Sequence, residues 1–362
     1  MKILIDINHP AHVHLFRHFA NRMTADGHEV FFTTREKEIS SYLLKHFGFN
    51  FVSFGKHYKS LFGKLWGLLK FDYKLYKTAK KFKPDLFLSM GSMYAAQVSV
   101  FMRKPHIALD DTEHKTSHHI LYVPFSDVLV NPACFTKDFG KKQIRYEGFH
   151  ELAYLHPNYF TPNPGILDTL KVAPGEKYVV LRFVSWDASH DVGQSGFSFS
   201  MKQKIVNRLS RDYKVFISSE TPLPGAFRGY ALSTRPEEIH DVLHYASLYI
   251  GESPTMTTES ALLGTPAICV SSWAYYCGNF KDLKQYGLID CCRPPEEGSV
   301  LNRALQLLED PGTPEEWIQK RDNLLKDKTD VTAFLVWLIK EYPGSIETLK
   351  KNPRIQFERP QQ

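Results

Sequence analysis

The first 34 residues constrain the fold more than any other stretch of the chain. Residues 2–7 (KILIDI) and 29–34 (EVFFTT) are short and mostly apolar, as is typical of strands. Between them, apolar residues recur at helical spacing until Gly27, where a helix is expected to end. A strand, a helix and a second strand in this order predict a parallel sheet with helices on both faces.

The same alternation continues through the 362 residues and divides the chain into two α/β halves. The boundary is expected where Pro, Asn and aromatic residues accumulate after Tyr146. The expected parts are an N-terminal Rossmann-like domain (1–147), an interdomain linker (148–170), a C-terminal Rossmann-like domain (171–330), and a helix crossing back to the first domain with a frayed polar tail (331–362).

Cysteine usage and hydropathy indicate the compartment. The five cysteines have no C-x-x-C spacing, which favours a reducing compartment over a disulfide framework or a zinc site. The chain enters a strand at once, without the apolar core of a signal peptide, and no apolar run approaches the ~18 residues of a spanning helix. We therefore expect a cytoplasmic protein.

The segment 247–266 (SLYIGESPTMTTESALLGTP) predicts a strand, a tight polar turn and a helix. Ser253 is a suitable helix cap, and Gly264 supplies the stop. Free N–H groups and hydroxyls at the positive end of a helix favour a phosphate, and Glu259 is placed to accept two ribose hydroxyls. The alternative is ordinary capping and dipole complementation. The hydroxyl residues concerned are Ser253, Thr255, Thr257 and Thr258.

Histidines gather where the first strand is expected to end. In an open parallel sheet, ligands bind at the carboxyl ends of the strands, so these side chains are candidates for a base or an anion contact. The alternative is a solvated or capping role. We expect no metal, because no thiol or paired carboxylate lies at ligand spacing. The candidates at this end are Asn8, His9, His12 and His14.

Two further strand ends carry candidate residues in the first half. One is the turn Gly91-Ser92 after the strand 85–90. The other follows the strand 106–110, where carboxylates suit acid–base chemistry or, alternatively, simple turn formation. The carboxylates are Asp110, Asp111 and Glu113.

In the second half, the strand 178–186 and the loop after it offer Arg182, Trp186 and His190 for contact with phosphate or sugar. His190 lies between two aspartates and suits an oriented base, or alternatively a helix cap. Thr234-Arg235-Pro236-Glu237 predicts a capping box ahead of an apolar helix, and Arg235 within it is a further candidate for a contact to the nucleotide base.

The segment 56–83 contains nine lysines and a single acid, Asp72. Leucines and aromatic residues recur through it at helical spacing, which is typical of a basic amphipathic helix on an anionic membrane surface. The alternative is an ordinary helix with a solvated lysine face. Nucleic acid is not expected, because no recognition motif accompanies the lysines.

Four motifs in combination identify the chain as a member of the DUF354 family, which resembles UDP-N-acetylglucosamine 2-epimerases and GT-B glycosyltransferases. They are HPAHVH, YEGFHELAYLHP, RFVSWDASHD and GESPTMTTESALLGTP. The resemblance implies a GT-B-like α/β fold of two Rossmann-like parallel-sheet domains facing a central cleft. In the resembled enzymes the loop before the helix at 254 holds a diphosphate, and the Glu at position 259 holds a ribose. A similar match of the stretch around His12 implies that this side chain faces the cleft.

Two positions depart from the resembled families. Pro254-Thr255 replaces a pair of glycines, and Ser92 stands where epimerases usually carry an Asp. The second departure favours a glycosyltransferase using a nucleotide-diphosphate sugar, with UDP preferred, over a 2-epimerase. A non-catalytic nucleotide-sugar-binding or membrane scaffold protein is the remaining alternative.

For a glycosyltransferase acting on a surface polysaccharide or glycolipid, the residues are expected to divide into three groups. The substrates are a nucleotide-sugar donor and a saccharide or lipid-linked acceptor, with no cofactor and no metal, at the inner face of the membrane. The groups are a catalytic one (His12, Glu113, His190), a donor-binding one (Arg182, Trp186, Arg235, Ser253, Thr255, Thr257, Thr258, Glu259) and an acceptor-side one (Asn8, His9, His14, Gly91, Ser92, Asp110, Asp111).

Overall fold

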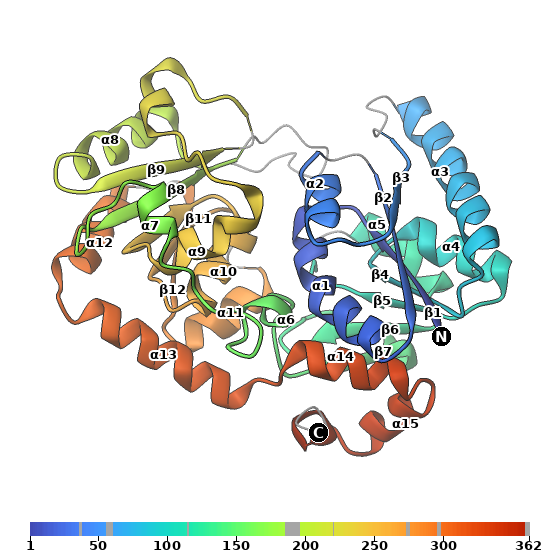
Figure 1. Ribbon diagram of the computed structural model, residues 1–362. Coiled ribbons are helices and arrows are strands. Elements are labelled where there is room, and N and C mark those ends of the chain that lie inside the picture. Colours follow the sequence, from blue (N-terminus) through green and yellow to red (C-terminus); the bar gives the residue numbers. More distant parts are fainter. Residues whose placement is uncertain are drawn as a thin grey trace. The chain divides into compact units, whose positions relative to one another are not determined.

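The computed structural model describes residues 1–35, 38–55, 61–113, 116–184, 196–219, 221–272, 276–294 and 298–358. The chain divides into two compact units (Figure 1). The first comprises Met1–Tyr159 together with Thr329–Gln362, and the second comprises Phe160–Lys328.

The described strands of the first unit form one parallel sheet in the order β3-β2-β1-β4-β5-β6-β7. The expected strand–helix–strand opening is confirmed. The strands are β1 (Lys2–Ile7), β2 (Glu29–Thr34), β3 (Phe51–Ser53), β4 (Leu86–Met90), β5 (His106–Leu109), β6 (Val128–Pro132) and β7 (Gln143–Tyr146).

The helices of the first unit cover both faces of this sheet (Figure 1). Starting from β1, the chain adds β2 and β3 on one side of that strand, and it then adds β4 to β7 on the other side. Because the crossovers are right-handed, this reversal puts α1 and α2 on one face of the sheet and α3, α4 and α5 on the other. The helices are α1 (Pro10–Ala25), α2 (Glu38–His46), α3 (Leu61–Phe82), α4 (Met93–Met102), α5 (Thr116–Tyr122), α6 (Leu152–Leu155), and the 3-10 turns η1 (Val123–Phe125) and η2 (Gly140–Lys142).

The periodicity of α1 predicts its buried face. Its apolar residues at helical spacing are all buried. The helix begins at Pro10, whose missing N–H costs nothing in the first turn, and Gly27 follows with a φ of +81° that favours glycine. These buried residues are Val13, Phe16, Phe19, Ala20 and Met23.

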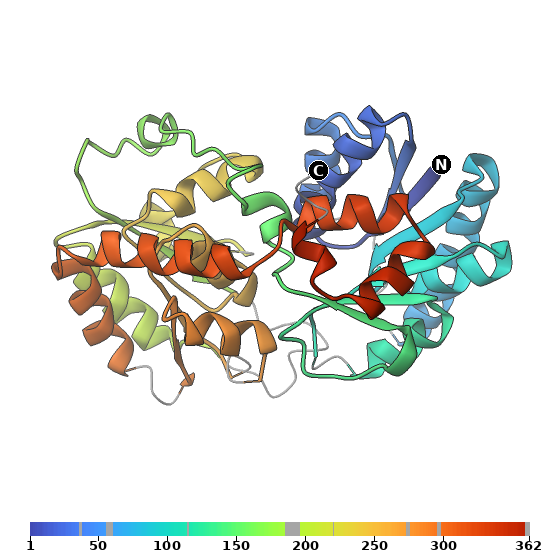
Figure 2. The same cartoon turned by 90° about the horizontal axis from the view of Figure 1, so that it is seen from below.

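Residues 148–159, assigned above to a linker, belong to the first unit. The whole of α6 is buried, and α14 (Val331–Lys340) packs on both α6 and α1 (Figure 2). Gly148 shows how close this packing is, since a Cβ there would lie 2.9 Å from the Val331 side chain. The high content of Pro, Asn and aromatics marked a packed corner rather than an open connection.

The C-terminal segment is more ordered than its polar sequence indicates. After α14 the chain forms α15 (Gly344–Lys351) and α16 (Ile355–Glu358). Gln356 is buried, and its side-chain oxygen accepts the N–H of Glu147 at 2.7 Å. A polar side chain that satisfies a buried backbone group therefore anchors part of the predicted frayed tail.

The described strands of the second unit form a parallel sheet in the order β12-β11-β10-β8-β9. Its strands are β8 (Tyr178–Phe183), β9 (Lys214–Ser219), β10 (Leu248–Gly251), β11 (Ala267–Val270) and β12 (Ile289–Cys292). Its helices are α7 (Ile166–Thr169), α8 (Phe199–Leu209), η3 (Gly225–Tyr230), η4 (Pro236–Glu238), α9 (Ile239–His244), α10 (Pro254–Leu262), α11 (Gly278–Gln285), α12 (Gly298–Glu309) and α13 (Thr313–Asp327).

Each unit is thus a parallel sheet with helices connecting its strands, as the sequence predicts. Among the described residues, no helix combines the length and apolar character that a membrane span requires.

Candidate functional site

In the second unit, the turn between β10 and α10 has the predicted local structure. Ser253 is the N-cap, with extended backbone angles, and its hydroxyl accepts the N–H of Met256. Pro254 occupies the first helical position. The helix start therefore presents backbone N–H groups at the carboxyl edge of a parallel sheet, which is a favourable place for an anion.

The hydroxyl residues of this helix lie in different surroundings. The Thr257 hydroxyl donates to the carbonyl of Ser253 at 2.8 Å, and both Thr257 and Thr258 are buried. Ser253 and Thr255 retain partial exposure. Only the first turn of α10, from Ser253 to Thr255, thus presents hydroxyls at the surface of the unit.

Glu259 lies one turn further along and is buried against α9. Its Oε1 is 3.1 Å from Nε2 of His240, and both side chains are almost inaccessible to solvent. The sequence analysis missed His240, because nothing in its local pattern distinguishes it from other helical histidines. A ligand that reaches Glu259 therefore meets a carboxylate whose orientation an imidazole already fixes.

Glu252 also escaped the sequence analysis, although it lies inside the 247–266 segment. This carboxylate is fully buried and joins two distant parts of the chain. Its Oε2 accepts the N–H of Val184 at 2.8 Å and lies 3.1 Å from Nζ of Lys202, while its Oε1 accepts the N–H of Phe197 at 2.7 Å. Glu252 therefore joins the residue after β8 to the residue before the N-cap of α8.

Arg182 lies beside the β10–α10 turn. It is the register partner of Gly251 on the neighbouring strand, and its Nη1 donates to the Ser218 hydroxyl at 2.8 Å. The approach is so close that a Cβ on Gly251 would lie 2.8 Å from Cβ of Arg182. Trp186 and His190, the other candidates from this region, lie outside the described residues.

Arg235 is on the surface. It precedes η4, and its guanidinium binds Glu238 at 2.5 Å in a capping box. This box lies one residue later than the predicted one, which ran from Thr234 to Glu237. A second carboxylate, that of Glu237, lies 3.5 Å from its Nε. The structure gives Arg235 a local capping role and does not bring it into contact with the residues of the β10–α10 turn.

In the first unit, the histidines at the end of β1 separate into two environments. His9 caps α1, its Nδ1 accepting the N–H of Ala11 at 3.2 Å, and His12 lies nearby with its Nδ1 3.5 Å from the N–H of Asn8. His14 is buried instead, with its ring 5.5 Å from that of Tyr154. Asn8, His9 and His12 therefore share one exposed corner, and His14 belongs to the core.

The β4–α4 turn joins a buried charged cluster. Gly91 has a φ of +56°, and Ser92 caps α4 by accepting the N–H of Ala95 at 3.2 Å. The Ser92 hydroxyl also donates a hydrogen bond to the Asp6 carboxylate on β1.

Arg35 completes this cluster. Its two terminal nitrogens each lie 2.9 Å from Oδ2 of Asp6, and the guanidinium stacks over the Tyr94 ring at 4.5 Å. The Thr33 hydroxyl donates to the other oxygen of Asp6 at 2.6 Å. The ion pair is wholly buried, and neither of its members was singled out from the sequence.

The carboxylates after β5 turn inward to different degrees. Asp110 binds Nε2 of His119 at 2.9 Å and the Tyr122 hydroxyl at 2.5 Å. Burial raises the pKa of Asp110. The hydrogen bonds from His119, from Tyr122 and from the Thr112 N–H together outweigh burial and hold this pKa below its usual value. Glu113 is buried and accepts the N–H of Thr136 at 3.4 Å.

Asp111 is the most accessible carboxylate of this group. Its Oδ1 accepts the hydroxyl of Thr112 at 3.1 Å. The charge of Asp111 acts on His150, a buried side chain whose Nδ1 lies 2.5 Å from the Tyr146 hydroxyl. Burial lowers the pKa of His150, against the opposing effect of the Asp111 charge. The family-like motif YEGFH contains it, but no spacing rule in the sequence indicated its position.

The family model described as protein of unknown function (DUF354) matches residues 1–328. The chain belongs to the DUF354 family. One relative of the chain is an uncharacterized protein of Methanocaldococcus jannaschii. It is 24% identical over 279 residues, which cover 74% of this chain and 81% of the relative.

Solved structures share the fold of this DUF354 protein at low identity. One is the UDP-GlcNAc 2-epimerase of Neisseria meningitidis bound to UDP-GlcNAc, with a TM-score of 0.62, 12% identity, and coverage of 97% of this chain and 100% of that one. Another is the glycosyltransferase VinC in complex with dTDP, with a TM-score of 0.60, 13% identity, and coverage of 96% and 100%. The fold is therefore that of GT-B glycosyltransferases and these epimerases.

The DUF354 chain also carries a partly buried carboxylate, that of Asp72 on α3, close to the Asp6–Arg35 pair. Burial, and next the charge of Asp6, raise the pKa of Asp72 to about 7 from its usual 3.8. Between about pH 4 and about pH 7, folding therefore takes up a proton at Asp72. The stability that this proton contributes is complete below about pH 4 and is lost as the pH rises through about 7.

Replacing Asp72 by asparagine is expected to remove this pH dependence. The variant should unfold like the wild type near pH 4 and be more stable above about pH 7.5, by about 1–2 kcal/mol once screening of the partly exposed carboxyl is allowed for. Urea unfolding across this range measures the difference. If the two proteins differ in their free energy of unfolding by the same amount at every pH, titration of Asp72 is not the cause of the difference.

Proposed function

We propose that this DUF354 protein is a GT-B-type glycosyltransferase that uses a nucleotide-diphosphate sugar, preferably a UDP-sugar, in the synthesis of a surface polysaccharide or glycolipid. The observation that carries the proposal is the capped first turn of α10 at the carboxyl edge of a parallel sheet, with Arg182 on the neighbouring strand. The structural neighbours reported above, bound to UDP-GlcNAc and dTDP, support a nucleoside-diphosphate ligand.

The donor's diphosphate is proposed to bind at the first turn of α10, through backbone N–H groups and the hydroxyls of Ser253 and Thr255. Glu259 would then accept the ribose hydroxyls, with His240 holding its carboxylate in place. Thr257 and Thr258 would support the turn from within, because both are buried. Arg182, Trp186 and Arg235 are proposed to contribute further contacts to the phosphates, the sugar and the base.

The proposed chemistry is attack of an acceptor hydroxyl on the anomeric carbon of the donor. A carbon–oxygen bond to the acceptor forms, the bond to the diphosphate breaks, and the hydroxyl proton passes to a base of the protein. Of the candidates His12, Glu113 and His190, the partly exposed His12 suits this role better than the buried Glu113. The helix N-terminus would stabilise the departing diphosphate, so the proposed mechanism uses no metal ion.

The acceptor is proposed to lie against the exposed corner formed by Asn8, His9 and His12. Gly91, Ser92, Asp110 and Asp111 belong to the same sheet edge, since the carboxyl ends of parallel strands meet there. His14 is too deeply buried to touch an acceptor and would support this corner from the core.

The surroundings of Ser92 favour glycosyl transfer over 2-epimerisation. The nearest carboxylate to its hydroxyl is Asp6, which is fully buried and held by Arg35 and Thr33. Such a group cannot readily exchange a proton with a sugar, as an epimerase acid or base must. The epimerase nevertheless remains the second proposal, because a UDP-GlcNAc 2-epimerase shares the fold.

The helix α3 is proposed to make a peripheral contact with an anionic membrane at the inner face. Phe71, Leu75 and Ala79 pack into the core of the unit. The opposite side of the helix is exposed and carries Leu69, Tyr73 and Tyr76 among lysines. An outward face of this composition suits an anionic bilayer.

Calorimetry with UDP, GDP, dTDP, CMP and UDP-N-acetylglucosamine tests the donor site. One diphosphonucleotide is expected to bind the wild type, and Glu259→Ala is expected to weaken that binding at least tenfold, about 1.4 kcal/mol. Glu316→Ala, which removes an exposed carboxylate of α13 in the same unit, is the matched control.

Thermal unfolding without nucleotide separates a binding defect from a folding defect, because Glu259 also pairs with His240. If no member of the panel binds the wild type, the donor-site proposal fails, and the non-catalytic scaffold becomes the leading alternative.

A further inference from the structure

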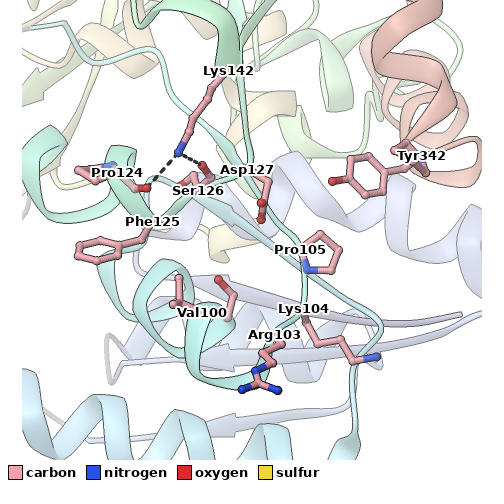
Figure 3. Close-up of a pocket in the computed structure, with 12 residues that line it drawn as sticks. Val100, Arg103, Lys104, Pro105, Pro124, Phe125, Ser126, Asp127, Lys142 and Tyr342 are labelled. Carbon is pink, nitrogen blue, oxygen red and sulfur yellow. Dashed lines mark hydrogen bonds between the residues drawn. The ribbon is translucent and has the colours of Figure 1, made fainter.

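A surface cavity of about 520 Å³ lies in the first unit, away from the residues assigned to the donor and the acceptor (Figure 3). The end of α4, the turn η1, the two residues before β6 and the residues after α14 line it, together with Lys142 of η2. The end of α4 and the residues before β6 lie at the amino-terminal edge of the sheet, opposite to the edge that carries His12 and Asp110.

The cavity is predominantly basic. Arg103 and Lys104 lie on one side and Lys142 on the other, against a single acid, Asp127 (Figure 3). One oxygen of Asp127 accepts the N–H of His106 at 2.9 Å. The Lys142 ammonium is held by the carbonyls of Pro124 and Ser126 at 3.0 and 2.8 Å, which keeps its charge at the rim.

Arg103 is the most available of these charges. Within the part of the chain that the structure describes, its guanidinium has no hydrogen-bond or ion-pair partner, and the residue is exposed. Lys104 has only a distant partner, Asp85 at 3.7 Å, and both members of that pair are exposed. An exposed ion pair of this kind is weak and leaves Lys104 able to bind another anion.

Exposed apolar side chains surround the cavity. Phe101, at the end of α4, is 79% exposed, and Ile120 on α5 is 66% exposed. Val100, Leu121 and Phe125 are also exposed, and α4 contacts both α5 and η1. Single apolar residues on a surface are ordinary, but a contiguous group of this size marks an interaction site.

This group continues the outward face of α3, which packs on α4. We define the apolar–basic surface as the following apolar and cationic residues of α3, of the end of α4 and the two residues after it, of α5 and of η1: Leu69, Lys70, Tyr73, Tyr76, Lys77, Lys80, Lys81, Val100, Phe101, Arg103, Lys104, Ile120, Leu121 and Phe125. Two exposed acids border this surface, Asp85 beside Lys104 and Asp127 in the cavity.

We propose that the apolar–basic surface lies on an anionic lipid bilayer and that the cavity beside Arg103 receives the phosphate of a lipid headgroup. The exposed aromatic and aliphatic side chains enter the boundary between headgroups and acyl chains. The cationic side chains around them bind the phosphates. This extends the membrane contact proposed for α3 to a second region, centred on α4 and η1, that the sequence did not indicate.

Charge complementarity favours a bilayer over a protein partner. A bilayer offers anionic groups across its whole plane above an apolar layer, which matches cations interleaved with apolar side chains over three neighbouring helices. Protein interfaces instead tend to exclude lysine from their core.

Flotation with vesicles tests the inference in the absence of nucleotide, so its outcome does not depend on glycosyl transfer. The wild type is expected to float with phosphatidylcholine vesicles containing about a quarter phosphatidylglycerol, and much less with pure phosphatidylcholine. Arg103→Glu is expected to raise the apparent Kd about thirtyfold, and Phe101→Ser about fivefold or more. Arg228→Glu on η3 makes the same charge change in the second unit and should have no effect.

A second variant separates binding from folding. Arg103 has a φ of +52°, a conformation that favours glycine. Arg103→Gly should therefore be at least as stable as the wild type and still bind the anionic vesicles about fivefold more weakly.

Three results would overturn the inference. The first is that the wild type does not float with anionic vesicles at all, as expected of a surface that docks a protein. The second is that only the α3 variant Lys77→Glu/Lys80→Glu loses binding, which would confine the contact to α3. The third is that glycerol 3-phosphate binds tightly in an Arg103-dependent way while vesicles do not bind, which would make the cavity a site for a soluble phosphate.

Discussion

Replacing Arg35 by methionine is expected to lower the free energy of unfolding by about 3–5 kcal/mol. The substitution leaves the Asp6 carboxylate buried without its cation, and both side chains of the pair are almost fully excluded from solvent. The cost arises from that unpaired charge rather than from the net strength of the ion pair. Urea unfolding near neutral pH measures it.

The double variant Arg35→Met/Asp6→Leu is the sharper test. Removing both charges should recover much of the stability that the single variant loses, because no uncompensated charge remains. The exposed pair of Lys2 with Glu29 provides the control, and Lys2→Met should cost at most about 1 kcal/mol. An equal effect of Arg35→Met and Lys2→Met would show that burial of the Asp6 pair has no energetic consequence.

Replacing Glu252 by alanine is expected to destabilise the second unit by about 3–4 kcal/mol. The N–H groups of Val184 and Phe197 would lose their acceptor, and the ammonium of Lys202 would lose its carboxylate. Each buried group left unsatisfied costs about 1–3 kcal/mol. Unfolding monitored by hydrogen exchange at residues 184 and 197 reports the loss locally.

Glu252→Gln distinguishes shape from charge. It keeps the length of the side chain and one acceptor oxygen, so it should lose about half as much stability as the alanine variant. Glu176→Ala removes a partly exposed carboxylate of the same unit and should cost far less stability than Glu252→Ala. If Glu252→Ala cost no more than Glu176→Ala, the Glu252 carboxylate would not be what joins Val184 to Phe197.

The fold was predictable because its determinants are local. The buried stripe of α1 is visible in the spacing of Val13, Phe16 and Phe19, and the start of α10 is visible in Ser253-Pro254. Periodicity and capping act within a few residues, so a single sequence displays them. The linker at 148–159 was misjudged because composition does not reveal that α14, nearly two hundred residues later, covers α6.

The environment of the candidate residues was less predictable for the same reason. Glu259 meets His240, Ser92 meets Asp6, and Asp110 meets His119, each through contacts that the sheet topology creates. Sequence reasoning placed His14 with the other histidines of its segment, but the helix turns its ring toward Tyr154 in the core. Strand ends can be located from sequence, whereas the partners that gather there depend on the order of the strands.

The return of the chain to the first unit has a consequence for synthesis on the ribosome. The helix α14 packs against α1, although more than three hundred residues separate them in the sequence. Residues 160–328 form one uninterrupted unit and can fold before α14 has left the exit tunnel. The first unit is therefore completed after the second, although α1 is made earlier, and until then the surface of α1 that α14 covers stays open to a chaperone.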